Sequence, residues 1–168
     1  CGGALLDPLD DPYGHGTHVA GTVLGRGAGE FDSNRGVSPR TDDIWIARIF
    51  GDDGGPGDTL GALFWMAEGA DADVSSNSWG CCDADIELLC WWDSLHGGTG
   101  FTAVAADRMA YETGISYVFA AGNAGDACVD ASGDPSMSLY APADAKNVIS
   151  VAATRDDPFA LDERASFS

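Results

Sequence analysis

The residues of this chain best suited to acid–base chemistry are two histidines, His15 and His18. His15 stands between Gly14 and Gly16 at the start of a segment with helical spacing, which leaves one side of its imidazole open. An imidazole titrates near neutral pH and can therefore serve as a general base. Since His18 shares the helical face of His15, a metal pair is an alternative, as is a capping role. Because no Glu follows His15 as a metalloprotease helix requires, the pattern favours a general base.

A second candidate for chemistry is Asn123, which follows the apolar segment 115–120 and Gly122. A side-chain amide at the end of a buried strand can donate a hydrogen bond to the oxyanion of a tetrahedral intermediate, a contact worth about 3 kcal/mol. Taken alone, the pair Gly122-Asn123 also has the composition of an ordinary turn. Both interpretations stay open on these residues alone.

Such side chains must be positioned by regular elements, and the sequence alternates between strand and helix patterns. Short apolar runs bounded by Asp, Gly or Asn predict buried strands at 44–50, 115–120 and 148–153, with a weaker one at 73–79. Helices are expected at 17–24, 59–70 and 101–113. This alternation predicts an α/β fold with a mostly parallel sheet and crossover helices. The loops that follow the strands should carry the chemistry.

The charge balance excludes one class of function. The 168 residues include 27 acidic and 8 basic side chains, for a net charge of −19, and this excludes nucleic-acid binding through a basic surface. An apolar content of 45% fits one globular domain. No apolar run of about 18 residues predicts a membrane span, and residues 1–11 do not have the pattern of a signal peptide. The lysine-poor acidity suits high ionic strength, although a GC-rich genome would favour the same usage.

The five cysteines favour disulfides in an oxidising compartment, because none forms a zinc-like pair of C-x-x-C units. Cys82 and Cys90 flank a short acidic segment that a disulfide could close. Buried free thiols are the alternative.

Three runs, in order along the chain, resemble the subtilisin-like serine peptidases, the subtilases. They are His15-Gly16-Thr17-His18-Val19-Ala20-Gly21-Thr22, Asn77-Ser78-Trp79-Gly80 and Phe119-Ala120-Ala121-Gly122-Asn123. The resemblance implies a mostly parallel sheet with helices on both faces, and a serine endopeptidase that hydrolyses peptide bonds through an Asp-His-Ser triad. It further implies that His15 is the triad base, that His18 is structural and that Asn123 is the oxyanion-hole donor.

The same resemblance implies protein or peptide substrates and the residues that hold them. Substrate backbone would pair with Ser78, Trp79 and Gly80, which wall the primary specificity pocket, while Ala121 and Gly122 would line the same cleft. Gly54 and Gly55 would clamp the residues before the cleaved bond. A Trp after the Ser also occurs in kexin-like members, so an acidic pocket for Arg or Lys is one option and solvated loop carboxylates are the other. The carboxylates in question are Asp126, Asp130 and Asp134.

The sequence departs from the family pattern at two triad positions. Only 14 residues precede His15, so the acidic motif is missing, and Asp11 is too close to replace it. The chain ends in Ser166-Phe167-Ser168, a stretch that resembles the one before the nucleophile motif. Ser136 echoes that motif but lacks the preceding Gly-Thr. We therefore expect residues 1–168 to be a partial catalytic domain, incomplete at both ends, inactive and poorly folded alone.

Further expectations concern cofactors, location and alternatives. The chemistry needs no cofactor, but the family commonly carries structural calcium, and Glu30, Asp32 and Asn34 alternate as in a calcium loop or an ordinary polar loop. We expect a secreted, monomeric protein. The first alternative is a catalytically inactive subtilase-fold binding or structural module, and the second is a calcium-dependent acidic surface domain.

Overall fold

The computed structural model of the chain describes residues 10–27, 34–50, 58–80, 98–123, 125, 139–157, 159 and 162–168. The chain divides into two compact units, which we call the first unit (1–62) and the second unit (63–168). Each unit is described here by itself. Among the described residues, no helix has the length and apolar character needed to cross a membrane.

The first unit contains the helix α1 (His15–Leu24). Gly14 precedes the helix in a left-handed conformation, with φ 71°, which a glycine adopts without steric cost. After the helix, the segment that includes Val37 and Ser38 runs back along its last turn. The N–H of Val37 donates to the carbonyl of Thr22 at 3.1 Å, and that of Ser38 donates to the carbonyl of Val23 at 2.7 Å. These contacts satisfy carbonyl groups that the end of a helix otherwise leaves without partners.

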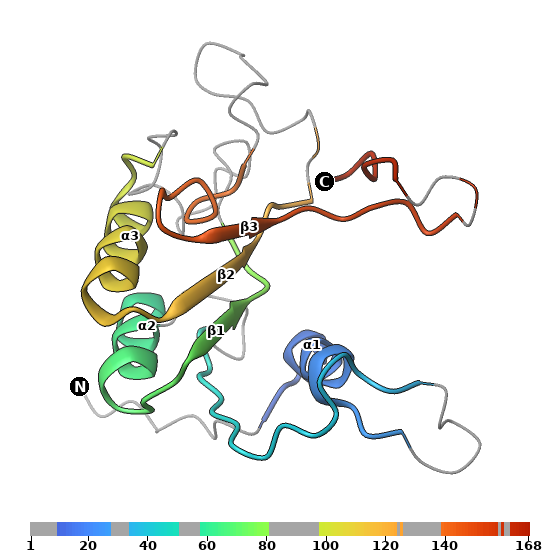
Figure 1. Cartoon of the computed structure of the whole chain (residues 1–168), viewed down its shortest axis with the longest axis horizontal. Helices are drawn as coiled ribbons and strands as arrows, with labels where there is room; N and C mark the ends of the chain where they lie inside the picture. The colour runs from blue at the N-terminus through green and yellow to red at the C-terminus, as the bar shows by residue number, and fades with distance from the viewer. Residues whose placement is uncertain are drawn as a thin grey trace. The chain divides into compact units, whose positions relative to one another are not determined.

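The second unit is built on a parallel sheet of β1 (Val74–Asn77), β2 (Ser116–Ala120) and β3 (Ile149–Val151). The strands lie in the order β1-β2-β3, and both pairs are parallel (Figure 1). The helix α3 (Phe101–Thr113) connects β1 to β2, as a parallel pair requires. The carboxyl ends of the strands therefore emerge at one edge of the sheet.

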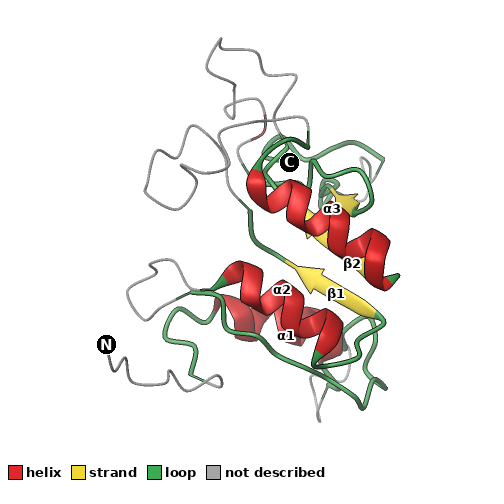
Figure 2. Ribbon diagram, turned by 90° about the vertical axis from the view of Figure 1, so that its left-hand side faces the viewer, coloured by secondary structure: helices red, strands yellow, loops and turns green. Residues whose placement is uncertain are grey.

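The core of the second unit lies on one face of this sheet. Tyr117 and Phe119 of β2 alternate inward and are fully buried. They share one apolar cluster with Leu63 of α2 (Thr59–Glu68) and with the small side chains of α3, so these helices cover the same face (Figure 1, Figure 2). The hydroxyl of Tyr117 donates to the carbonyl of Leu63 at 3.1 Å, which satisfies a polar group inside the core.

The structure confirms the α/β class and most of the predicted elements. Helix α3 has the predicted bounds and ends at Gly114, whose φ is 74° and whose N–H donates to the carbonyl of Ala110 at 3.1 Å. The strands β1 and β3 are shorter than the predicted segments 73–79 and 148–153. The sequence predicts helices on both faces of the sheet. In the second unit, α2 and α3 pack against the same face.

One predicted strand is wrong. The segment 44–50 has no regular strand, and only Phe50 forms a single bridge. Ile44, Trp45 and Ile46 are 44%, 53% and 54% exposed, so the apolar run is not part of a buried sheet. Its β-branched and aromatic composition favours an extended backbone, but a strand also requires a neighbouring backbone to pair with, which composition does not encode.

Candidate active site

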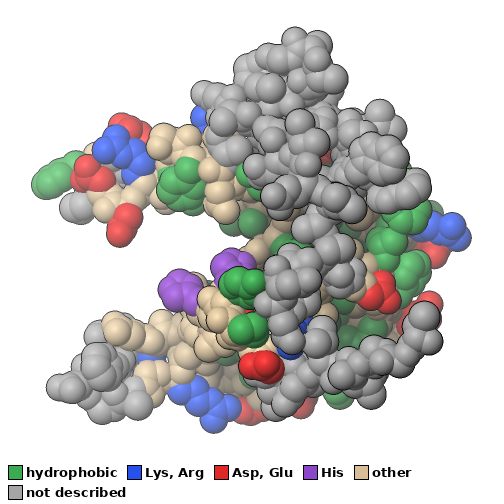
Figure 3. All heavy atoms as spheres, turned by 180° about the vertical axis from the view of Figure 1, so that it is seen from behind, with side chains coloured by type: hydrophobic (Ala, Val, Ile, Leu, Met, Phe, Trp, Pro, Cys, Tyr) green, Lys and Arg blue, Asp and Glu red, His purple; other side chains and the backbone are tan. Residues whose placement is uncertain are grey.

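His15 is the first residue of α1, and its imidazole is solvent-accessible because His15 is exposed. Figure 3 shows histidine side chains at the surface of the molecule. His18, one turn later on the same helix, is exposed as well. His15 therefore meets the first requirement of a general base, which is access to a group that donates a proton.

The start of α1 is held by the carboxylate of Asp11. Its Oδ1 accepts the N–H of Gly14 at 3.0 Å, and its Oδ2 accepts the N–H of Thr17 at 2.7 Å. Gly14 has no side chain with which to cap the helix, so Asp11 supplies the acceptor from outside it. The sequence indicates that Asp11 is too close to His15 to be the triad acid and predicts a local role for it, lining the substrate cleft or facing solvent. Its capping of α1 depends on the folded backbone.

These hydrogen bonds favour the ionised form of Asp11. The hydrogen bond from the Thr17 backbone lowers the pKa of Asp11 below its ordinary value of 3.8, with smaller contributions from Gly14 and from the nearby His15. A carboxylate with this pKa is charged throughout the pH range in which an imidazole titrates. At neutral pH the first turn of α1 is therefore held by a negatively charged carboxylate near His15.

The second unit brings together two of the predicted substrate-binding segments. Asn77 of β1 is the register partner of Phe119 of β2, so the residues that follow these strands leave the sheet side by side. One segment holds Ser78, Trp79 and Gly80, and the other holds Ala121, Gly122 and Asn123. Ligands of open parallel sheets bind at this edge.

Trp79 is oriented toward the core rather than standing free at this edge. Its ring meets that of Phe119 edge-on, with centroids 5.5 Å apart at 84°. Its Nε1–H donates to Oδ1 of Asn77 at 3.2 Å, while Nδ2 of Asn77 donates to the carbonyl of Val118 at 3.3 Å. The indole therefore fastens the end of β1 to β2, and Ser78, which is exposed, is left accessible at the strand end.

The segment after β2 is fixed on both sides before it reaches Asn123. The N–H of Ala121 donates to the carbonyl of Val151 at 2.9 Å, and its carbonyl accepts the N–H of Tyr140 at 3.0 Å. Farther on, the N–H of Gly125 donates to the carbonyl of Phe167 at 2.9 Å. Asn123 itself is exposed, so its amide is presented to solvent from an anchored backbone.

Tyr140 is the residue of this edge that the sequence did not single out. Its side chain lies against both Gly80 and Gly122. The sequence signal for Tyr140 was that of a lone aromatic residue at the end of a loop rich in Gly, Asp and Ser, but which residues it contacts depends on the sheet register.

Several other predictions concern residues outside those described: Gly54 and Gly55, Glu30 and Asp32, Cys82 and Cys90, Ser136, and the carboxylates Asp126, Asp130 and Asp134.

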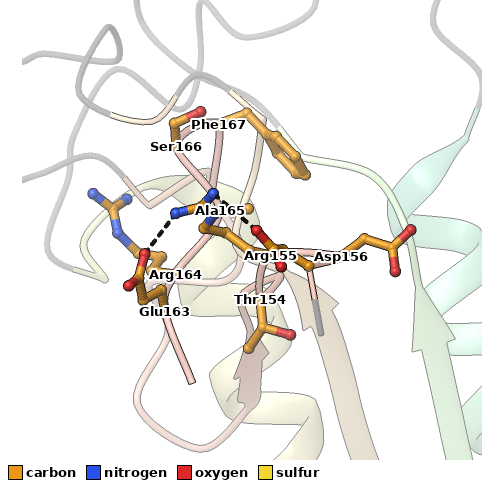
Figure 4. A pocket seen from close by; sticks show the side chains of 9 residues that line it. Thr154, Arg155, Asp156, Glu163, Arg164, Ala165, Ser166 and Phe167 are labelled. Carbon is orange, nitrogen blue, oxygen red and sulfur yellow. Dashed lines mark hydrogen bonds and ion pairs between the residues drawn. The ribbon is translucent and has the colours of Figure 1, made fainter. Parts of the chain in front are cut away.

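A hollow of about 650 Å³ lies farther along the second unit, between residues 154–157 and 163–167. The side chain of Arg155 lies among the acidic residues of its wall (Figure 4), 2.7 Å from Glu163 and 3.6 Å from Asp157. Arg155 already pairs with two carboxylates of the wall, and none of the site residues predicted from the sequence lines this hollow. We therefore place the candidate active site at the strand ends.

The described residues do not contain a group of three or more His, Cys, Asp or Glu side chains arranged to hold a metal ion. In that part of the chain, His15 and His18 lack a third ligand. Carbonyl and amide oxygens can also bind calcium, so this finding concerns sites built from those four side chains.

Comparison with known sequences identifies the family. Residues 6–168 match the Subtilase family. The chain is 35% identical over 158 residues to Alkaline protease 1 of Aspergillus clavatus, covering 94% of this chain and 32% of that protein. It is 30% identical over 165 residues to Subtilisin-like serine protease Pen ch 18 of Penicillium rubens, covering 96% of this chain and 28% of that protein. The chain thus spans about a third of the length of these relatives.

Fold and site together define an α/β protein whose polar residues gather at the carboxyl ends of parallel strands. With a match that extends over residues 6–168, the chain belongs to the subtilase family.

Proposed function

We propose that residues 1–168 are part of the catalytic domain of a subtilisin-like serine endopeptidase, and that His15 is the general base of its Asp-His-Ser triad. Membership of the subtilase family carries this proposal, because the relatives matched by the chain are named as proteases. The triad Asp and Ser would come from outside these residues. In this view the 168 residues alone are inactive, since loss of a triad member lowers kcat by about 10⁴-fold or more.

In the intact enzyme, the Ser oxygen attacks the carbonyl carbon of the scissile peptide bond, and His15 takes the Ser proton. His15 then gives this proton to the leaving amine, and water hydrolyses the acyl-enzyme in a second step of the same kind. The exposure of His15 at the start of a capped helix supports this role. Metal or organic cofactors take no part in these steps, and any calcium would be structural.

Asn123 would donate its amide N–H to the oxyanion that forms during each attack. Its exposure on a segment anchored through Ala121 supports this role, because an oxyanion donor must be fixed before the charge develops. Substrate backbone would lie along Ser78 and Gly80 as an added strand. The substrates would be proteins or peptides, and we expect a secreted monomer.

Labelling with a fluorophosphonate probe tests this function in the full-length protein that contains these residues. We expect labelling of the wild-type protein and none of His15→Ala, because the Ser is no longer activated. His18→Gln is the matched control on the same helix and should still be labelled. A folded wild-type protein that is never labelled would contradict the proposal and favour a binding or structural module.

The role of Asn123 is tested separately by steady-state kinetics. Asn123→Ala should lower kcat by about 10²- to 10³-fold with little change in KM, because the donor acts on the oxyanion and not on bound substrate. An increase in KM with unchanged kcat would assign Asn123 to substrate binding instead.

A further inference from the structure

Beyond β3, two short segments of the second unit run antiparallel to each other, with a bridge between Thr154 and Arg164 (Figure 4). The N–H of Ala165 donates to the carbonyl of Ala153 at 2.9 Å, as an antiparallel ladder requires. In a regular ladder the two residues of such a pair exchange two hydrogen bonds. The N–H of Ala153 would then donate in return to the carbonyl of Ala165.

Ser168 takes the place of this second hydrogen bond. Its Oγ accepts the N–H of Ala153 at 2.7 Å, and its own N–H donates to the carbonyl of Ala165 at 3.1 Å. One residue therefore satisfies both of the groups that the ladder would otherwise join. Since the N–H of Ala153 is partly buried, losing its acceptor is costly, and the side chain at position 168 has to carry an oxygen.

The hydrogen bond from Ser168 to Ala165 also closes a four-residue turn. The carbonyl of Phe167, the third residue of this turn, accepts the N–H of Gly125 at 2.9 Å. The turn and the glycine are packed together as well. A methyl group on Gly125 would overlap the carbonyl oxygen of Ser166 and would lie 3.5 Å from Cα of Phe167. The turn closed by Ser168 therefore supports the backbone of Gly125.

Asn123 lies in the sequence between two residues whose backbones are anchored, Ala121 and Gly125. The N–H of Ala121 donates to the carbonyl of Val151 in β3 at 2.9 Å, and Gly125 is held by the turn. The hydroxyl of Ser168 ties this turn to the backbone that follows β3. One side chain thereby links the two anchors of the segment that carries Asn123.

We propose that Ser168 is a positioning residue for the candidate oxyanion donor, Asn123. This inference rests on the proposed function, in which the amide of Asn123 donates to the oxyanion. Such a donor is effective only when its direction is fixed before the charge develops. The hydroxyl of Ser168 contributes to this by holding the turn, and with it Gly125, in place beside the end of β3. Ser168 acts through the backbone and needs no contact with substrate.

Steady-state kinetics of the full-length protein on one peptide p-nitroanilide test this role. Ser168→Ala should lower kcat about tenfold and leave KM unchanged, because displacing an oxyanion donor loses part of the 10²- to 10³-fold effect of removing it. Ser168→Thr keeps a hydroxyl oxygen and should restore most of kcat. Ser166→Ala is the matched control, since it changes an exposed serine of the same turn, and it should leave kcat unchanged.

A double-mutant cycle separates positioning from a general loss of structure. In an Asn123→Ala background, Ser168→Ala should change kcat by less than about twofold, because the donor that it displaces is already gone. Hydrogen exchange gives a readout without activity, and the amide of Gly125 should exchange about tenfold faster in Ser168→Ala than in wild type. If Ser168→Ala does not fold, Ser168→Cys, whose sulfur is a weaker acceptor, replaces it in both measurements.

Two results would overturn this inference and leave the proposed function intact. One is a folded Ser168→Ala protein that the fluorophosphonate still labels and whose kcat and Gly125 exchange match those of wild type. The other is a loss of kcat that is equally large in the Asn123→Ala background, which would give Ser168 a general structural role. A folded wild-type protein that the probe never labels would overturn the inference together with the proposed function.

Discussion

Oδ2 of Asp11 accepts a hydrogen bond from the backbone N–H of Thr17 at 2.7 Å. This hydrogen bond joins a residue that precedes His15 in the sequence to one that follows it. The other carboxylate oxygen of Asp11 accepts the N–H of Gly14 at 3.0 Å. One side chain thereby ties down the residue before His15 and a residue in the first turn after it. The geometry links the helix that carries His15 to a single acidic group.

Replacing Asp11 with Ala should loosen the first turn of α1, because two N–H groups lose their acceptor. In the full-length protein we expect the amide of Thr17 to exchange with solvent about tenfold faster, as fraying ends of helices do. Hydrogen exchange followed by mass spectrometry or NMR measures this. Asp11→Asn retains one acceptor oxygen and should have an intermediate effect, and unchanged exchange in Asp11→Ala would contradict the capping role.

The same contact predicts a dependence on acid. The pKa of Asp11 is lowered below 3.8 in the folded chain. The ionised carboxylate therefore contributes its full stabilisation of the folded chain at pH values above 3.8, the ordinary pKa of the group. That contribution is lost as the pH falls below 3.8 and through the lowered pKa. The chemical shift of the Thr17 amide should therefore titrate with a midpoint below 3.8, and in Asp11→Asn this titration should disappear. A midpoint at or above 3.8 would rule out the hydrogen bond as the cause.

Gly125 and Gly114 form a matched pair for testing the backbone near Asn123. Both have positive φ, 54° and 74°, but a methyl group would overlap the carbonyl oxygen of Ser166 only at Gly125. Gly114→Ala should cost about 1–2 kcal/mol of backbone strain alone. Gly125→Ala should cost more and should also lower kcat, because the backbone anchored to Phe167 must shift close to Asn123. Urea denaturation and steady-state kinetics of the full-length variants measure both effects, and equal effects would contradict this account.

The buried hydroxyl of Tyr117 should contribute measurably to stability. Tyr117→Phe removes its hydrogen bond to the carbonyl of Leu63, so we expect a loss of about 1 kcal/mol in the free energy of unfolding. Urea denaturation of the full-length protein measures this loss. Tyr111→Phe, at an 82% exposed position, is the control and should change little.

Tyr117 also predicts an alkaline limit to stability. Burial raises the pKa of Tyr117 above its ordinary value of 10.0, so the folded chain binds this proton more tightly than the unfolded chain does. The resulting contribution to stability is complete below pH 10.0 and declines as the pH rises above it. Tyr117→Phe should remove this part of the alkaline decline, and an identical decline in both proteins would contradict it.

The local sequence determined the helices and strands of this protein more closely than it determined the contacts between them. Helix α3 ends at Gly114, as predicted, because the left-handed residue that terminates a helix is a property of a few neighbouring residues. The α/β class followed from alternating strand and helix patterns for the same reason. The histidine motif is also local, so His15 could be singled out as a candidate base and placed at the start of a helix.

Tertiary structure alone decided which side chains meet. Trp79 packs on Phe119, and Tyr140 fills the space beside Gly80 and Gly122, because parallel pairing in a particular register brings distant segments together. The segment 44–50 has the composition of a strand but has no regular strand, since pairing depends on a partner and not on composition. Contacts between residues far apart in the sequence produce no periodic pattern in that sequence. The position of Tyr140 beside Gly80 and Gly122 is therefore evident only from the folded chain.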